Sequence, residues 1–384
     1  MTDKNDYVRF IISRLLSGMF GSVPSAVGGG IILDVFFLHD RGKAFICYEV
    51  SILLGAAVGP TFSGFISNSQ QWTICFWWTV PLLAISAIAV LLLAEETGYD
   101  RQKGTTPVKL PQRYIANRVA TFFPGAAVVS KPSAAEFVSI AYVARSAAAP
   151  FLIGLSPATI LVGVFTLVIF GWVLLNDVLS PTFLQTPLKE GGYGFTPIQN
   201  GAFSFATWLA IFAAQTVGLF INDSIPLWIC KHYHAGIWKP ELRLYCTSLT
   251  VVIVPIGLGI CGAGLQYHLH YMVYAVGVFV VALGTLISVP VATNYVAESF
   301  THYGTASTLV MTFYRLSWGV AIPFFIDSWI VRVHLGWVFG MAAFLTFAAW
   351  FLVLLLLWKG QTFRRWNLMK SLASSEEGVT VFEE

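Results

Sequence analysis

Long apolar stretches alternate with short polar ones along the whole chain. A helix needs about 20 apolar residues to cross the hydrocarbon core of a bilayer, which is about 30 Å thick. Nine stretches reach that length: 10–33, 44–66, 73–94, 151–175, 198–221, 244–267, 271–297, 304–326 and 335–358. Lipid offers the backbone no hydrogen-bond partner, so each stretch must satisfy its own peptide groups as a helix. The pattern therefore predicts an all-α polytopic membrane protein with nine transmembrane helices.

The composition agrees with a chain that is surrounded by lipid. Of the 384 residues, 57% are hydrophobic and 11% are charged, whereas soluble domains average about 45–50% and about 25%. A soluble fold of this length has too little interior to hide so much apolar surface. The net charge is only +3, and no basic run is interleaved with aromatic residues, so nucleic acid is not an expected partner.

No pattern in the sequence predicts catalysis, a metal site or a bound cofactor. The five cysteines are scattered and contain no CxxC pair, which excludes the usual zinc and redox motifs. Residues 257–262 spell GxGxxG, but they lie inside an apolar stretch and follow no strand, so they do not predict a dinucleotide site. Phosphate-binding loops, HExxH and GxSxG are absent. We therefore predict that the chain is not an enzyme.

The distribution of lysine and arginine predicts the orientation in the membrane. Sixteen of these residues flank the apolar stretches on one side of the predicted bundle, and two flank them on the other. Basic flanks stay in the cytosol. The central polar segment and the C-terminal tail are therefore expected to be cytosolic and the N-terminus to lie outside, with the plasma membrane as the expected location.

The polar segments also predict the domain organisation. Residues 1–94 hold three stretches, 95–150 form a cytosolic central loop, 151–358 hold six stretches, and 359–384 form a cytosolic tail. Secondary transporters are commonly built from three-helix repeats, two in each six-helix half. The chain therefore corresponds to one complete half, preceded by a single three-helix repeat of another.

Only three charged residues lie inside the apolar stretches: Arg14, Glu49 and Arg315. A charge within a membrane span is costly and is a functional candidate by default. Arg315 is twelfth of 23 residues in its stretch, where reaching the interface is hardest. Arg14 either faces a cavity or extends to the interface. Glu49 is a candidate for protonation, whereas Asp177 fits better as an interfacial acid that stays in water.

Uncharged polar residues extend the set of candidates. Asn176, Gln215, Asn294 and Tyr295 lie inside or at the edges of the later stretches. Such residues either line a substrate and proton pathway or form hydrogen bonds between helices, and the second role is the more common one.

Three motifs near the N-terminus carry a resemblance to a known family. They are R-x-x-x-G at 14–18, D-x-F-x-x-x-D-R-G at 34–42, and G-x-x-x-G-P-x-x-x-G at 55–64. They resemble the fourth helix, the loop after it and the antiporter motif of the fifth helix in the major facilitator superfamily, especially in the fungal twelve-helix drug:proton antiporters. Weaker similarity continues at 191–195, 222–227, 240–243, 294–295 and 313–315.

The resemblance implies roles for individual residues and an incomplete N-terminal half. It implies that Arg14 contributes to proton coupling. It assigns Gly55, Gly59, Pro60 and Gly64 to the antiporter-type motif, a close-packing seam that sets the bend between the halves, and it assigns Asp34, Arg41 and Gly42 to the cytosolic loop motif. The first predicted helix matches the family's fourth, so the family's first three helices have no counterpart here.

The function predicted from these observations is secondary active transport. A cavity lined by aromatic and small residues suits a small hydrophobic cargo, such as a drug, toxin or secondary metabolite. The resemblance implies efflux of that cargo in exchange for protons by alternating access. The alternative is a truncated membrane protein that does not transport.

Overall fold

A computed structural model describes residues 4–37, 39–93, 140–233, 238–300 and 303–365. Within these ranges the regular structure is entirely helical. Nine spans among the described residues are long and apolar enough to cross a membrane. The predicted fold class, an all-α polytopic membrane protein, is confirmed.

The N-terminal group contains three spans built from five helices. They are α1 (Lys4–Gly21), α2 (Val23–Val35), α3 (Arg41–Ser67), α4 (Ile74–Trp77) and α5 (Thr79–Leu93). The first span is interrupted at Ser22 because Pro24 has no N–H to donate and sits at the start of α2. In the same way α4 and α5 form one span that is interrupted at Trp78.

The C-terminal group contains six spans and a preceding helix. The helices are α8 (Ile140–Gly154), α9 (Pro157–Gln185), α10 (Pro197–Phe203), α11 (Phe205–Tyr233), α12 (Thr250–Gln266), α13 (Tyr271–Ser299), α14 (Gly304–Val333) and α15 (Leu335–Arg365). Two 3₁₀ helices, η1 (Leu188–Glu190) and η2 (Pro240–Leu249), precede α10 and α12.

Several predicted boundaries require correction. The stretch 151–175 was expected to be one helix from its first residue, but α8 ends at Gly154 and α9 begins at Pro157 and continues to Gln185. Proline is favoured in the first turn of a helix, which explains the new start. The predicted tail at 359 begins inside α15, whose backbone is non-helical at Lys359. Most of the predicted central loop and tail lies outside the described residues.

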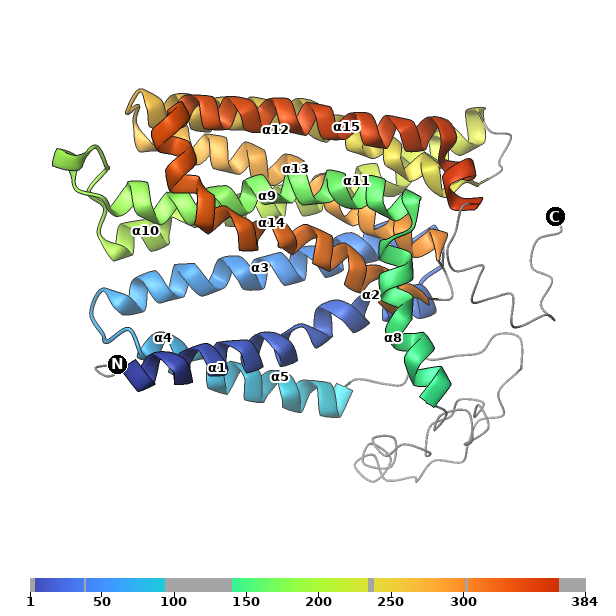
Figure 1. Ribbon diagram of the computed structural model, residues 1–384, viewed down its shortest axis with the longest axis horizontal. Coiled ribbons are helices and arrows are strands. Elements are labelled where there is room, and N and C mark those ends of the chain that lie inside the picture. Colours follow the sequence, from blue (N-terminus) through green and yellow to red (C-terminus); the bar gives the residue numbers. More distant parts are fainter. Residues whose placement is uncertain (1–3, 38, 94–139, 234–237, 301–302, 366–384) are drawn as a thin grey trace.

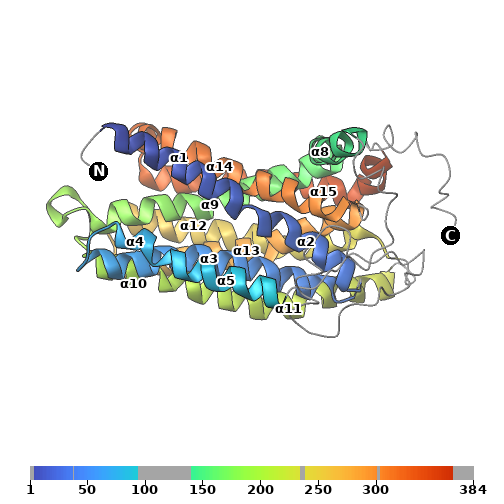
Figure 2. The same ribbon diagram turned by 90° about the horizontal axis from the view of Figure 1, so that it is seen from below.

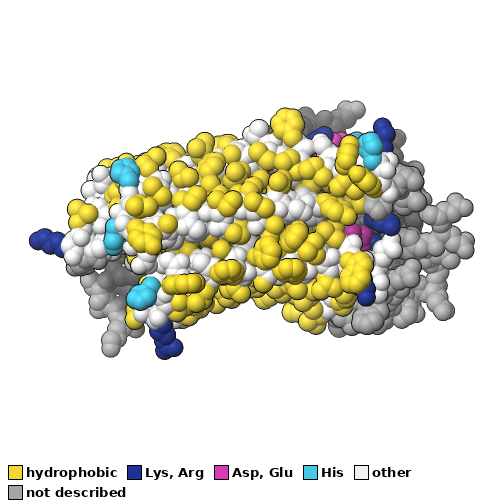
Figure 3. Space-filling model, turned by 90° about the horizontal axis from the view of Figure 1, so that it is seen from above, with side chains coloured by type: hydrophobic (Ala, Val, Ile, Leu, Met, Phe, Trp, Pro, Cys, Tyr) yellow, Lys and Arg dark blue, Asp and Glu magenta, His cyan; other side chains and the backbone are white. Residues whose placement is uncertain are grey.

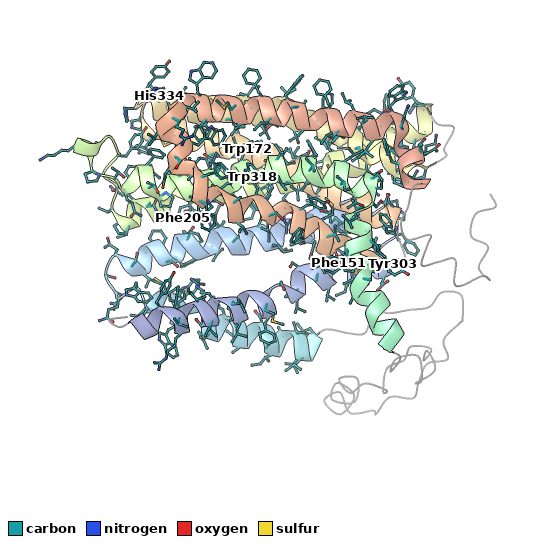
Figure 4. The ribbon with its side chains drawn as sticks, in the orientation of Figure 1. Phe151, Trp172, Phe205, Tyr303, Trp318 and His334 are labelled. Atoms are coloured by element: carbon teal, nitrogen blue, oxygen red, sulfur yellow. The ribbon has the colours of Figure 1, made fainter. Side chains whose placement is uncertain are left out.

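The packed core belongs to the C-terminal group. Helix α9 passes through it, with Phe165 and Trp172 almost fully buried. The Trp172 indole donates to Thr346 on α15 (2.8 Å) and meets Trp318 of α14 edge to face, with ring centroids 6.2 Å apart. Figure 4 shows these two tryptophans side by side within the bundle.

The outer surface is apolar around the middle of the molecule. Figure 3 shows hydrophobic side chains over most of the visible face, with lysine and arginine confined to its two ends. No residue of α5 is buried, although its 15 residues are almost all apolar. Surface of this kind is stable only in contact with lipid or with another apolar partner. The chain is therefore an integral membrane protein.

Helix α3 joins the two groups. In the view of Figure 1 it lies between α1–α2 and the C-terminal helices, and Figure 2 shows it beside α10 and α11, which it contacts together with α13. Helix α2 contacts α14 at the end of the bundle where α15 finishes, whereas α1 begins at the opposite end (Figure 1). Residues that couple the groups are therefore expected on α2, α3 and their partners.

Candidate functional site

A buried ion pair connects the two groups within the membrane. Arg315 of α14 donates from Nη1 to the Glu49 carboxylate on α3, and both side chains are 4% exposed. The Arg315 guanidinium also lies 5.3 Å from the Phe170 ring centroid on α9. Glu49 is eight residues from the start of α3, or about 12 Å along the helix. Two charges that are costly alone in an apolar interior thus neutralise each other.

The ion pair is incompletely satisfied. Nε of Arg315 has no hydrogen-bond partner among the described residues. Removing one member of a buried pair leaves an uncompensated charge and typically costs about 3–5 kcal/mol.

A second buried network lies around Arg243 of η2, near the first turn of α3. Arg243 is 2% exposed and donates from Nε to Glu298 of α13 (2.7 Å) and from Nη1 to Asp223 of α11 (2.9 Å). Its guanidinium also lies 5.0 Å from the Trp238 ring centroid. With its oxygen toward the guanidinium, the Asn294 amide accepts from Arg243 (3.1 Å) and donates to Glu298 (3.3 Å). One arginine therefore holds η2, α11 and α13 together.

This second network extends to the N-terminal group. Oδ2 of Asp223 accepts the backbone N–H of Lys43 in the first turn of α3 (3.0 Å). The first N–H groups of a helix have no partner within the helix, and its N-terminal end carries partial positive charge, so a carboxylate is favoured there. Asp223 thus links the start of α3 to α11.

Gly42 makes that link possible. A Cβ atom at this position would overlap the Asp223 carboxylate, which is itself buried. Any side chain would therefore push α3 away from α11 or displace Asp223 from Arg243.

We expect Gly42→Ala to destabilise the protein by about 1–3 kcal/mol, the usual cost of overpacking. Apparent melting temperature in detergent measures the change. The matched control is Gly259→Ala on α12, where a Cβ meets no atom within 4 Å, and where alanine is expected to hold or raise stability because glycine is a poor helix former. Equal melting temperatures for the two variants would contradict the proposed role of Gly42.

The loop between α2 and α3 is held by its own charged residues. Arg41 donates to the carbonyl oxygens of Phe36 (3.2 Å) and Leu33 (3.4 Å) at the end of α2. Lys43 pairs with Asp40 (3.1 Å). A cation at the C-terminal end of a helix satisfies unpaired carbonyls and complements the helix dipole.

Glycines of α2 allow close approach to α14. A Cβ at Gly29 would overlap Thr308, and one at Gly30 would overlap Thr305. The Thr308 hydroxyl also donates to the carbonyl of Ala26 (3.0 Å). Contacts between the two groups thus include α2 with α14, Glu49 with Arg315, and Asp223 with the start of α3.

Comparison with known sequences now identifies the family. The profile of the Major Facilitator Superfamily matches residues 4–323, which is most of the chain. The chain belongs to the major facilitator superfamily. No solved structure matches it.

Curated relatives of this major facilitator chain are fungal transporters. It is 28% identical to "Efflux pump radE" of Floropilus chiversii over 94% of the chain and 64% of that protein. It is also 28% identical to "MFS transporter prlG" of Fungal sp. (strain NRRL 50135) over 89% of the chain and 69% of that protein. The chain therefore spans less than two thirds of the length of radE. The predicted family is confirmed.

The structure brings some of the predicted pathway residues of this major facilitator chain together. Glu49 and Arg315 meet, and Asn294 joins the Arg243 network. Arg14 does not reach either site: it is exposed on α1, with its guanidinium 4.5 Å from the Phe76 ring centroid. Its role in proton coupling stays a prediction.

Three other predicted residues lie apart from both networks. Asn176 donates to the Trp172 carbonyl (2.9 Å) and accepts from Tyr274 (3.3 Å). Gln215 donates to Cys47 of α3 (3.2 Å). Tyr295 is buried, and its hydroxyl has no partner among the described residues. The bonds of Asn176 join or brace helices, as polar groups in membrane bundles commonly do.

The predicted glycine seam of the antiporter-type motif requires correction. No atom lies within 4 Å of a Cβ built at Gly55 or Gly59, so no described helix packs on them. Close approach occurs at Gly64 instead, where a Cβ would lie 2.9 Å from the Gly201 Cα. Pro60 lies inside α3, which continues past it. The middle of α3 packs on α11 and α13 through Leu53, Leu54 and Ala57 instead, so the two glycines lie on a different face of the helix.

Sequence reasoning did not select Asp223, Arg243 or Glu298 as site residues. Asp223 lies two positions beyond the apolar stretch 198–221 and Glu298 one position beyond 271–297, so neither stood out as a charge inside a stretch. The helices α11 and α13 continue past those limits and bury both carboxylates. The signal that could have indicated the network was the presence of two acidic residues and one arginine at the ends of neighbouring membrane spans.

Proposed function

We propose that this protein exports a small hydrophobic molecule across the plasma membrane in exchange for protons, by alternating access between its two groups of helices. In this proposal the central segment and the C-terminal tail face the cytosol. The observation that carries the proposal is the buried Glu49–Arg315 pair, because it couples a protonatable carboxylate to the contact between the groups.

Proton binding and opening are linked through this pair. While Glu49 is ionised, it holds Arg315 and keeps α3 against α14. A proton on Glu49 cancels the attraction and leaves Arg315 as the uncompensated charge, which favours separation of the helices. Glu49 becomes ionised again when its proton leaves on the other side of the membrane. The second network at Asp223 and Arg243 holds the cytosolic end during the ionised state.

The surroundings of the pair support a hydrophobic cargo. The interior faces of α9, α13 and α14 carry mainly aliphatic and aromatic side chains. Sites for sugars or phosphates need several fixed polar anchors. The name of the relative radE, an efflux pump, agrees with export.

Transport in proteoliposomes tests the proposal directly. We expect Nile red, a neutral hydrophobic dye, to move faster toward an acidified compartment than in liposomes without a pH gradient, since protons flow the opposite way. Glu49→Gln removes the titratable group, so its flux is expected to lose this dependence on the gradient. Flux that is equal with and without the gradient in the wild-type protein would contradict proton coupling.

A second candidate is a membrane protein that inserts and folds but does not carry cargo. One observation favours it: α1 and α5 bury no described side chain, so the N-terminal group contributes little to a closed wall around a transport pathway. For this candidate we expect a folded, correctly inserted sample to show no dye flux under any gradient.

A further inference from the structure

Helix α8 is oriented unlike the membrane spans. Figure 1 shows it running across the direction of α9, α14 and α15, and Figure 2, seen at a right angle to the first view, shows it foreshortened while those spans keep their length. It lies at the end of the bundle where α15 finishes. A helix that crosses the spans at this end runs along the membrane surface and not through the membrane.

The corner between α8 and α9 fixes this orientation. Helix α9 begins anew at Pro157, because proline suits the first turn of a helix. The Tyr314 hydroxyl of α14 donates to the Gly154 carbonyl at the end of α8 (2.9 Å), and the Tyr314 ring fills the space that a Cβ at Gly163 of α9 would need. One tyrosine therefore holds both helices of the corner against α14.

The side chains at the C-terminal end of α8 divide into an inner and an outer face. Ala149 and Ile153 are 2% and 0% exposed and belong to the core of the C-terminal group. Phe151 and Leu155 are 75% and 61% exposed. The Leu155 N–H still donates to the Phe151 carbonyl (3.0 Å), so these two residues lie one helical turn apart on the same face. The outer face is therefore apolar, and the described residues leave most of it uncovered.

The composition of this outer face favours lipid as its partner. Residues 147–155 contain no charged side chain, so a polar partner would gain no ion pair from them. The exposed apolar surface continues on α14, against which α8 packs: Phe313 and Val320 are 73% and 70% exposed. Helices that lie in the membrane plane bury such a face at the boundary between lipid headgroups and acyl chains.

Helix α8 also lies at the level of this boundary. Its last residue, Gly154, lies beside Val310 and Tyr314, which are six and ten residues from the start of α14, or about 9 and 15 Å along the axis. The 30 residues of α14 form a helix about 45 Å long, which extends about 7 Å beyond each side of a hydrocarbon core about 30 Å thick. The end of α8 thus lies just inside the edge of that core.

An aromatic residue marks the same level. Tyr303 is the N-cap residue of α14 and is 44% exposed. Figure 4 shows it at the same end of the bundle as Phe151. Tyrosine is enriched where a membrane meets water, so its position agrees with a membrane surface at the level of α8.

We propose that α8 is an interfacial helix: it lies in the plane of the membrane, inserts Phe151 and Leu155 among the acyl chains, and fixes the corner at Tyr314 to the lipid surface. Because Arg315 follows Tyr314 directly, this contact also holds the arginine of the buried ion pair at a constant depth. The assignment concerns where the chain contacts lipid, so it does not depend on the proposed transport.

Spin labels on the full chain in phosphatidylcholine liposomes test the assignment. Cys47→Ser with Cys75→Ser removes the two cysteines that are not buried, and Phe151→Cys or Leu155→Cys then introduces one label on the outer face. Molecular oxygen partitions into the bilayer, whereas nickel(II) ethylenediaminediacetate stays in the water on both sides, so the two relaxation rates give the depth of the label. We expect both labels about 5–10 Å inside the boundary between headgroups and acyl chains, the depth of interfacial helices.

Two control positions calibrate that depth. Lys189→Cys places a label on the exposed helix η1, where we expect it to lie in water, and Phe344→Cys replaces a 72% exposed side chain of α15, where we expect the label to lie in the hydrocarbon core. Labels on α8 that meet nickel as readily as Lys189→Cys, or that lie as deep as Phe344→Cys, would overturn the assignment. Protection of both α8 labels from both reagents would also overturn it, because a protein surface such as a second copy of the chain would then cover the face.

Discussion

Arg315→Ala is expected to abolish proton-dependent dye flux, reducing it to below about a tenth of the wild-type rate, and to destabilise the fold. The substitution leaves Glu49 buried without its partner, which typically costs about 3–5 kcal/mol. It also removes the charged contact between α3 and α14 on which the proposed coupling depends. Flux in proteoliposomes and apparent melting temperature in detergent measure the two effects.

A double variant separates coupling from stability. Glu49→Gln with Arg315→Gln removes both charges and leaves two amides that can bond to each other. We expect it to recover much of the melting temperature lost by Arg315→Ala, because no unpaired charge remains, while flux stays independent of the pH gradient. Arg332→Ala, an exposed arginine on the same helix, is expected to change neither quantity. Wild-type flux in Arg315→Ala would refute the role of the pair in coupling.

Arg243→Ala is expected to cause the larger loss of stability. It leaves two buried carboxylates, Asp223 and Glu298, without the guanidinium that neutralises both. Unpaired buried charge costs about 3–5 kcal/mol, and repulsion between the two acids adds to it. We expect the apparent melting temperature to fall by about 10 °C, with loss of the link between Asp223 and α3.

The control variant for Arg243→Ala changes a residue at the same end of the bundle. Lys231→Ala removes an exposed cation from the last turn of α11, and we expect a change within about 0.5 kcal/mol. Arg243→Lys keeps a charge but lacks the planar fork that reaches two carboxylates, so an intermediate melting temperature is expected. If Arg243→Ala melts at the wild-type temperature, the network does not stabilise this end of the bundle.

The two networks divide the work of the proposed cycle. Glu49 and Arg315 lie within the membrane, where a proton changes the balance of charge most. Asp223 and Arg243 hold η2, α11, α13 and the first turn of α3 together. Separation of α3 from α14 therefore requires the start of α3 to leave Asp223 as well. Movement at the two sites is expected to be concerted.

The sequence identified individual members of the site but not their partners. Glu49 and Arg315 stood out because each is a lone charge in an apolar stretch. Their pairing was not predictable, because they are 266 positions apart and a helical pattern shows only which face a residue occupies. Asp223 and Glu298 were missed for a related reason: the apolar pattern ends where a charge begins, even when the helix continues and buries that charge.

The sequence alone determined the nine spans, the all-helical class and the family. Each crossing of the lipid requires an apolar segment of sufficient length and a backbone whose hydrogen bonds are satisfied within that segment. Both requirements are local properties of the chain. Tertiary structure alone decided that Arg315 meets Glu49, that Arg243 gathers two acids, and that Arg14 and the glycines at 55 and 59 stand apart. Those outcomes depend on how helices from distant parts of the chain are rotated and placed against one another, because a side chain is neutralised only by the groups that packing brings within a few ångströms.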